Sequence, residues 1–123
     1  MKHHTETWGK IDLITSRDGR YRPHAYSFVL AAVEYTIGLL PEPRHVSAVE
    51  LLEGIRRYAI EEFGPMAKQV FNYWGVASTE DFGNIVFNLI DEELLGRADE
   101  DRLEDFGGVY DFGKVFEEDY YRG

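Results

Sequence analysis

Apolar residues recur at helical spacing through most of this chain, and glycine, proline or capping residues separate the runs. The clearest start is Ser47-Ala48-Val49-Glu50, a capping box in which the serine oxygen accepts from the third helical amide and the glutamate reaches back. One apolar helical face follows, formed by Leu51, Leu52, Ile55, Tyr58 and Ala59. Because Gly64 is a natural terminator, the spacing predicts a helix between Ser47 and Gly64.

The same signals predict four further helices. They cover residues 5–16, 23–37, 65–74 and 79–94. Proline suits the first turn of a helix, as at Pro23 and Pro65, and the hydroxyl of Ser78 or Thr79 can cap the last one. The predicted fold class is therefore all-α, a compact bundle of about five helices.

The composition is that of a chain able to build its own core. Its 123 residues are 44% hydrophobic and 15% aromatic, which favours one folded domain over residues 1–123. The chain has no cysteine, which excludes disulfides, thiolate nucleophiles and cysteine metal sites. No apolar run approaches the roughly 20 residues that span a bilayer, and the N-terminal sequence lacks the apolar stretch of a signal peptide. We therefore expect a cytoplasmic protein with no membrane partner.

Negative charge is concentrated at the C-terminal end of the chain. The formal net charge is -10, and residues 81–123 hold 13 acids against 4 bases. Within this part, the segment 97–123 has too many aromatic residues for a solvated tail. We expect this segment to be packed, either on the helical domain or on a partner. A small β element after residue 96, as in a winged helix, is an alternative conformation for it.

A short basic stretch near the N-terminus offers a complement to the acidic segment. The leading hypothesis is therefore a non-catalytic protein–protein interaction or self-association module, whose partner is another protein or a second copy of the chain. The candidate contact residues are Arg20, Tyr21 and Arg22 in a basic set, and Asp105, Phe106, Tyr110, Asp111 and Phe112 in an acidic set.

Two histidines lead to an alternative, a small-molecule binder or an enzyme. His24 and His45 are the ligand candidates, because an imidazole beside a carboxylate can bind or catalyse. They share no metal-ligand spacing, and the chain has no nucleophile elbow, no phosphate-binding glycine loop and no complete calcium loop. The sequence thus predicts no cofactor, no metal site and no catalytic residue, and an enzyme is the less favoured class.

A third hypothesis is a nucleic-acid regulator built on the winged-helix layout. Its recognition helix would begin near Ser78, with Glu80 and Asp81 in the first turn and no arginine or lysine before Arg97. The phosphate backbone repels a helix with this charge. The acidic balance of the chain therefore disfavours nucleic acid as a partner.

Several runs together resemble one known family. They are RYRPHAYSFVLAAVEYT, RHVSAVELLEGIRRYA, FGPMAKQVFNYWGV and STEDFGNIVFNLI, with EDF and YDF near the end. These runs, which lie within residues 17–116, resemble an uncharacterised family of small bacterial proteins known chiefly from planctomycetes and verrucomicrobia. The stretch from WGV to IVF is the most specific part. The resemblance implies a stand-alone single domain, and it implies no activity, cofactor or catalytic residue.

Overall fold

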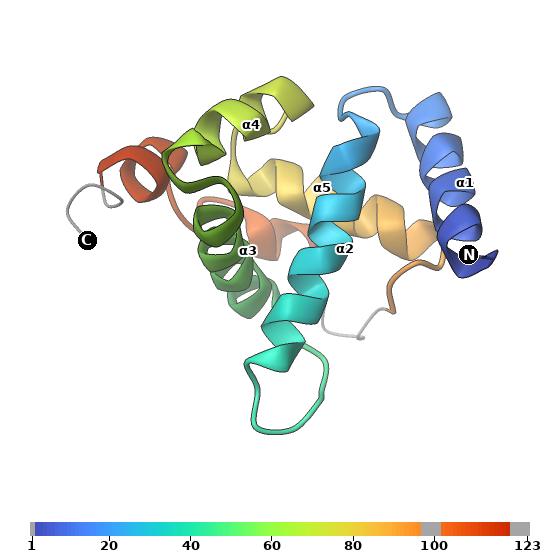
Figure 1. Cartoon of the computed structure of the whole chain (residues 1–123), viewed down its shortest axis with the longest axis horizontal. Coiled ribbons are helices and arrows are strands. Elements are labelled where there is room, and N and C mark those ends of the chain that lie inside the picture. The colour runs from blue at the N-terminus through green and yellow to red at the C-terminus, as the bar shows by residue number, and fades with distance from the viewer. Residues whose placement is uncertain (1, 97–101, 119–123) are drawn as a thin grey trace.

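The structure, a computed structural model, describes residues 2–96 and 102–118, with side chains from residue 6 to residue 116 (Figure 1). Five α-helices make up most of it: α1 (Lys2–Arg17), α2 (Pro23–Gly38), α3 (Ala48–Phe63), α4 (Ala67–Trp74) and α5 (Thr79–Asp91). The all-α class and the number of helices predicted from the sequence are confirmed.

Three shorter helical turns complete the described chain. η1 (Gly64–Met66) joins α3 to α4, η2 (Leu103–Phe106) comes after α5, and η3 (Lys114–Glu118) is a π-helical turn. Residues 102–118 contain no strand, so the β element considered after residue 96 is not formed in this part. The rest of the 97–123 segment lies outside the described residues.

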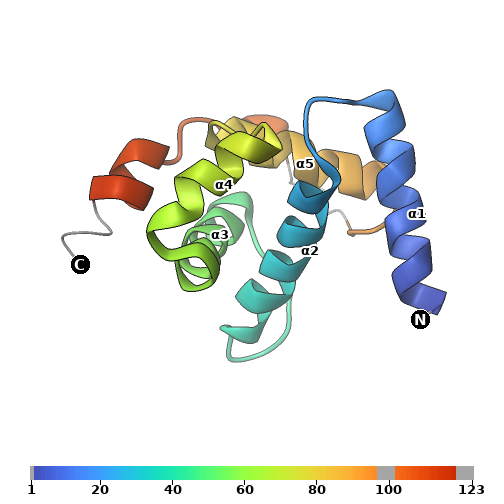
Figure 2. The same ribbon diagram turned by 45° about the horizontal axis from the view of Figure 1, so that its top comes forward.

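α2 is the central helix of the bundle, with α5 crossing behind it (Figure 1). α2 packs along α3 on one side, while α1 lies at one edge of the molecule and η3 at the opposite edge (Figures 1 and 2). η2 packs on α5 and α3. The chain therefore returns across the bundle after its last long helix.

The contact between α2 and α3 depends on one glycine. A Cβ atom at Gly54 would overlap with the side chain of Thr36 on the facing helix. Thr36 is buried, and its hydroxyl donates to the carbonyl oxygen of Ala32 at 2.7 Å, so its polar atom needs no solvent. The two helices thus approach closely at a position that only glycine fits.

The predicted capping box at the start of α3 is present. The Ser47 hydroxyl accepts from the amide of Glu50 at 3.2 Å, and the Ser47 amide donates to the Glu50 carboxylate at 2.9 Å. Arg44 donates to both oxygens of the same carboxylate, at 3.0 and 2.8 Å. Hydrogen bonds from Arg44 and Ser47 lower the pKa of Glu50 to about 2. These contacts fix where the chain enters α3.

The C-terminal segment forms part of the core. Phe106, Phe112 and Phe116 are buried, and the rings of Phe112 and Phe116 lie 5.6 and 5.3 Å from that of Phe71 on α4. The Tyr110 hydroxyl donates to the carbonyl oxygen of Leu52 on α3 at 2.8 Å. Of the two packing partners expected for this segment, residues 102–116 thus use the domain itself.

No helix in the described part of the chain is both long enough and apolar enough to cross a lipid bilayer.

Candidate functional site

Polar side chains bind the turn between α1 and α2 to α5. The Tyr21 hydroxyl donates to Oδ1 of Asp81 at 2.6 Å and accepts from Nδ2 of Asn84 at 2.9 Å. Burial, together with the neighbouring Asp81 carboxylate, raises the pKa of Tyr21 to about 12. Because Tyr21 is only 3% exposed, its hydroxyl serves the internal contact rather than the surface.

Arg20 belongs to the same polar set. Its guanidinium donates to the two carboxylate oxygens of Asp18 at 2.9 and 2.7 Å, which holds the pKa of Asp18 well below its usual range. The Asn88 amide on α5 donates to Asp18 at 2.9 Å and to the Tyr26 hydroxyl at 3.1 Å. Asp18 therefore links Arg20 to Asn88 on α5 within the same chain.

Arg22 lies differently, against the end of α4. Its Nε donates to the carbonyl oxygen of Tyr73 at 2.9 Å, and its guanidinium carbon lies 4.1 Å from the centroid of the Tyr73 ring. The backbone amide of Arg22 donates to the carbonyl oxygen of Trp74 at 3.1 Å. Gly75 allows this approach, because a Cβ atom there would overlap with the carbonyl oxygen of Arg20.

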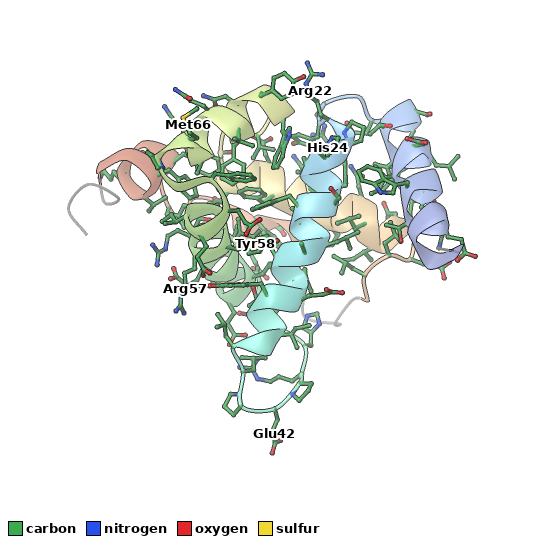
Figure 3. All side chains as sticks on the ribbon, viewed as in Figure 1. Arg22, His24, Glu42, Arg57, Tyr58 and Met66 are labelled. Atoms are coloured by element: carbon green, nitrogen blue, oxygen red, sulfur yellow. The ribbon has the colours of Figure 1, made fainter. Side chains whose placement is uncertain are left out.

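The outer side of α4 and η1 is exposed. Tyr73 is 65% exposed and Met66 is 53% exposed, and Gln69 lies between them on the same side of the helix. Together with Arg22, these residues are called the α4 face. Figure 3 shows Arg22 and Met66 along the same edge of the molecule.

The charge of the α4 face differs from that of the chain as a whole. Its two stretches of sequence, residues 19–33 and 63–79, contain no aspartate or glutamate, whereas the whole chain has a net charge of -10. Among the described residues, the two terminal nitrogens of Arg22 have no hydrogen-bond or ion-pair partner. The α4 face is thus a surface without carboxylates of its own that presents one guanidinium.

The structure divides the predicted acidic set. Phe106 and Phe112 are buried and Tyr110 is half-buried, so these aromatic side chains belong to the fold, whereas Asp105 and Asp111 are exposed. In the described part of the chain, no hydrogen bond or ion pair joins the acidic set to the basic set. The two sets are not brought together within one chain.

Two apolar pockets lie along α2. The smaller, of about 200 Å³, is lined by residues of α2, α3 and α5 and by Phe106, with His45 and Ser47 as its polar lining. The larger, of about 430 Å³, lies between α1, α2 and the residues that follow α5. Val33 and Leu95 line both pockets, so the two pockets adjoin along α2, and together they are called the α2 groove.

The two candidate histidines lie apart from each other. His24 is exposed and its ring lies 5.5 Å from that of Trp8, whereas His45 lines the smaller pocket. No carboxylate is among the described residues that line this pocket, and no group of three or more potential metal-ligating side chains occurs within the described ranges. The expected histidine–carboxylate pair is therefore not assembled in the pocket.

Sequence reasoning missed the α4 face. A signal was present, because Met66, Gln69 and Tyr73 recur at helical spacing inside a stretch without acids. The signal is ambiguous, because methionine at helical spacing is equally typical of a buried helix face. The α2 groove gave a weaker signal, since Leu30, Val33 and Ile37 are the same residue types that fill a core.

Comparisons with protein-family models, with curated proteins and with solved structures each find no match to this chain. The family resemblance of the sequence therefore stays a prediction.

Proposed function

We propose that the protein is a non-catalytic interaction module that binds an acidic segment of a partner protein through the α4 face. The observation that carries this proposal is the exposure of Tyr73, Met66 and Arg22 on two stretches of chain that contain no carboxylates. Tyrosine, methionine and arginine are the residue types enriched at protein interfaces.

The geometry of Arg22 supports an acidic partner. Its guanidinium is held over the Tyr73 ring and by the Tyr73 carbonyl oxygen, which limits the side-chain freedom that binding would remove. The terminal nitrogens of a guanidinium match the two oxygens of a carboxylate. Elsewhere the chain, with its net charge of -10, repels an acidic segment, so binding there is disfavoured.

The test is affinity capture from native lysate, compared across matched variants. Arg22→Glu and Tyr73→Ala alter the α4 face. Their controls are Arg57→Glu, an exposed arginine on α3 (Figure 3), and Leu13→Ala, a 60% exposed apolar residue on α1. We expect both face variants to lose the captured protein by about tenfold or more, as at an interface hot spot, while both controls retain it.

Two further measurements identify the partner. Capture should survive nuclease and weaken as salt rises, because exposed charge pairs are screened. A mass determination of the purified protein shows whether the partner is a second copy of the chain. Capture that nuclease abolishes, or that all four variants retain equally, would contradict the proposal.

A further inference from the structure

Helix α2 carries two apolar faces. One lies in the core, where Tyr26 and Val29 are fully buried. The second, formed by Leu30, Val33 and Ile37 at helical spacing, is only half-buried. A helix that is apolar on both sides is usually covered on both, but the second face of α2 lines the two pockets of the α2 groove.

The α2 groove is elongated. Leu30 lines its larger pocket, Ile37 lines its smaller one, and Val33 lies between them in both. The strip from Leu30 to Ile37 is about 10 Å long at 1.5 Å per residue. A concave apolar surface of this shape suits one unbranched hydrocarbon chain of about that length.

The charge in the larger pocket comes from one carboxylate. Glu34 is the only acid or base among the described residues that line it. Glu34 is exposed and has no hydrogen-bond or ion-pair partner in the described part of the chain. The ring of Trp8 lines the same pocket, and a carboxylate beside an aromatic ring attracts a cation and repels an anion.

From this geometry we infer that the α2 groove binds a small cationic amphiphile. Its hydrocarbon chain lies along Leu30, Val33 and Ile37, and its ammonium group lies beside Glu34 and Trp8. The groove shares no residue with the α4 face, so this inference does not depend on the proposed function.

Three probes with the same chain and different head groups test the inference. They are octyltrimethylammonium, 1-octanol and octanoate, each titrated calorimetrically into the full chain, the two ions below their micelle concentrations and the alcohol below its solubility limit. We expect the cation to bind about two- to fivefold more tightly than the alcohol, as for a charge pair at an exposed site, and octanoate to bind least.

Matched variants separate the head group from the hydrocarbon chain. Glu34→Gln should remove the preference for the cation and leave octanol binding unchanged. Its control, Glu42→Gln, lies on the turn between α2 and α3 (Figure 3) and should keep the preference. Val33→Gln should weaken all three probes about tenfold or more by adding polar surface between the pockets. Leu95→Gln should do the same from outside α2.

Thermal melts first confirm that each variant is folded. The inference is supported if the cation preference disappears in Glu34→Gln alone and both glutamine substitutions in the groove wall reduce binding. It is overturned if the three probes bind equally, if Glu42→Gln acts like Glu34→Gln, or if neither Val33→Gln nor Leu95→Gln changes binding.

Discussion

Two apolar regions of this molecule differ in how completely the rest of the chain covers them. The inner sides of α3, α4 and α5 are covered by residues 102–116, whose Phe116 is 0% exposed. The outer strip of α2, with Leu30, Val33 and Ile37, is covered by no described segment to the same extent and stays half-buried beside two pockets. Both regions consist of apolar side chains. They differ in whether another segment of the same chain covers them.

This difference separates residues that hold the fold from residues that are available to bind. A side chain covered by its own chain contributes its transfer free energy to folding. A side chain in an open groove retains part of that free energy, which a ligand can gain on binding. Substitutions in the two regions should therefore differ in the size of their effect on stability.

The largest effect on stability is expected from truncating a buried ring in the region that residues 102–116 cover. Phe116→Ala should lower the free energy of unfolding by about 3–5 kcal/mol, because it removes a fully buried ring from the aromatic cluster. Ile37→Ala, on the half-buried strip, should cost only about 1 kcal/mol. Urea denaturation of the two variants measures both values. Equal losses would break the distinction between the two regions.

Gly83 tests how closely the C-terminal segment lies on α5. A Cβ atom at Gly83 would lie 2.8 Å from Cβ of Phe106, so Gly83→Ala should destabilise by about 2 kcal/mol through overpacking. Gly9→Ala on α1, where nothing lies within 4 Å of the added atom, should instead stabilise by about 0.5–1 kcal/mol. Opposite signs in thermal melts support the close approach, and a stabilising Gly83→Ala would contradict it.

Alkaline pH should lower the free energy of unfolding through Tyr110, which lies in the covered region. Burial raises the pKa of Tyr110, whereas an unfolded tyrosine ionises near a pKa of about 10. Above that pH the unfolded state loses a proton that the folded state retains, so stability falls as pH rises. Tyr110→Phe should reduce this fall by about 1 kcal/mol per pH unit.

Denaturation series between about pH 9 and pH 12 measure the fall in stability. A Tyr110→Phe variant with the same slope as the wild type would show that Tyr110 does not hold its proton in the folded state.

The smallest effect on stability is expected at Glu93, which lies between the end of α5 and the groove residue Leu95. Glu93 has a φ of 61°, a left-handed conformation that favours glycine after a helix. Glu93→Gly should therefore stabilise by about 0.5–1 kcal/mol. A thermal melt shows the gain, and a destabilised variant would mean that the Glu93 side chain contributes a contact of its own.

The helices were predictable because their signals are local. Pro23, Ser47 and Ser78 mark helix starts by their own chemistry, and apolar spacing then fixes the face that turns inward. α1 begins earlier than the sequence predicted, at Lys2, since its first turns carry no apolar pattern.

The surfaces were less predictable because they depend on the packing of distant segments. Arg20 and Tyr21 were predicted to contact a partner, yet Asp18 and α5 engage them. Arg20 and Arg22 are both exposed, but Arg20 is paired with Asp18, whereas the terminal nitrogens of Arg22 have no partner in the described part of the chain. Composition could not separate these neighbours, because their difference arises where the turn meets α5 on one side and α4 on the other.

The position of Phe106, Phe112 and Phe116 after all five helices has a consequence for synthesis. A ribosome makes every long helix before it makes the rings that cover α3, α4 and α5. During that interval the nascent helices expose apolar sides that attract chaperones or other nascent chains. Slow translation of the codons for residues 106–116 would prolong this exposure, so the yield of native protein should depend on how quickly this stretch is completed.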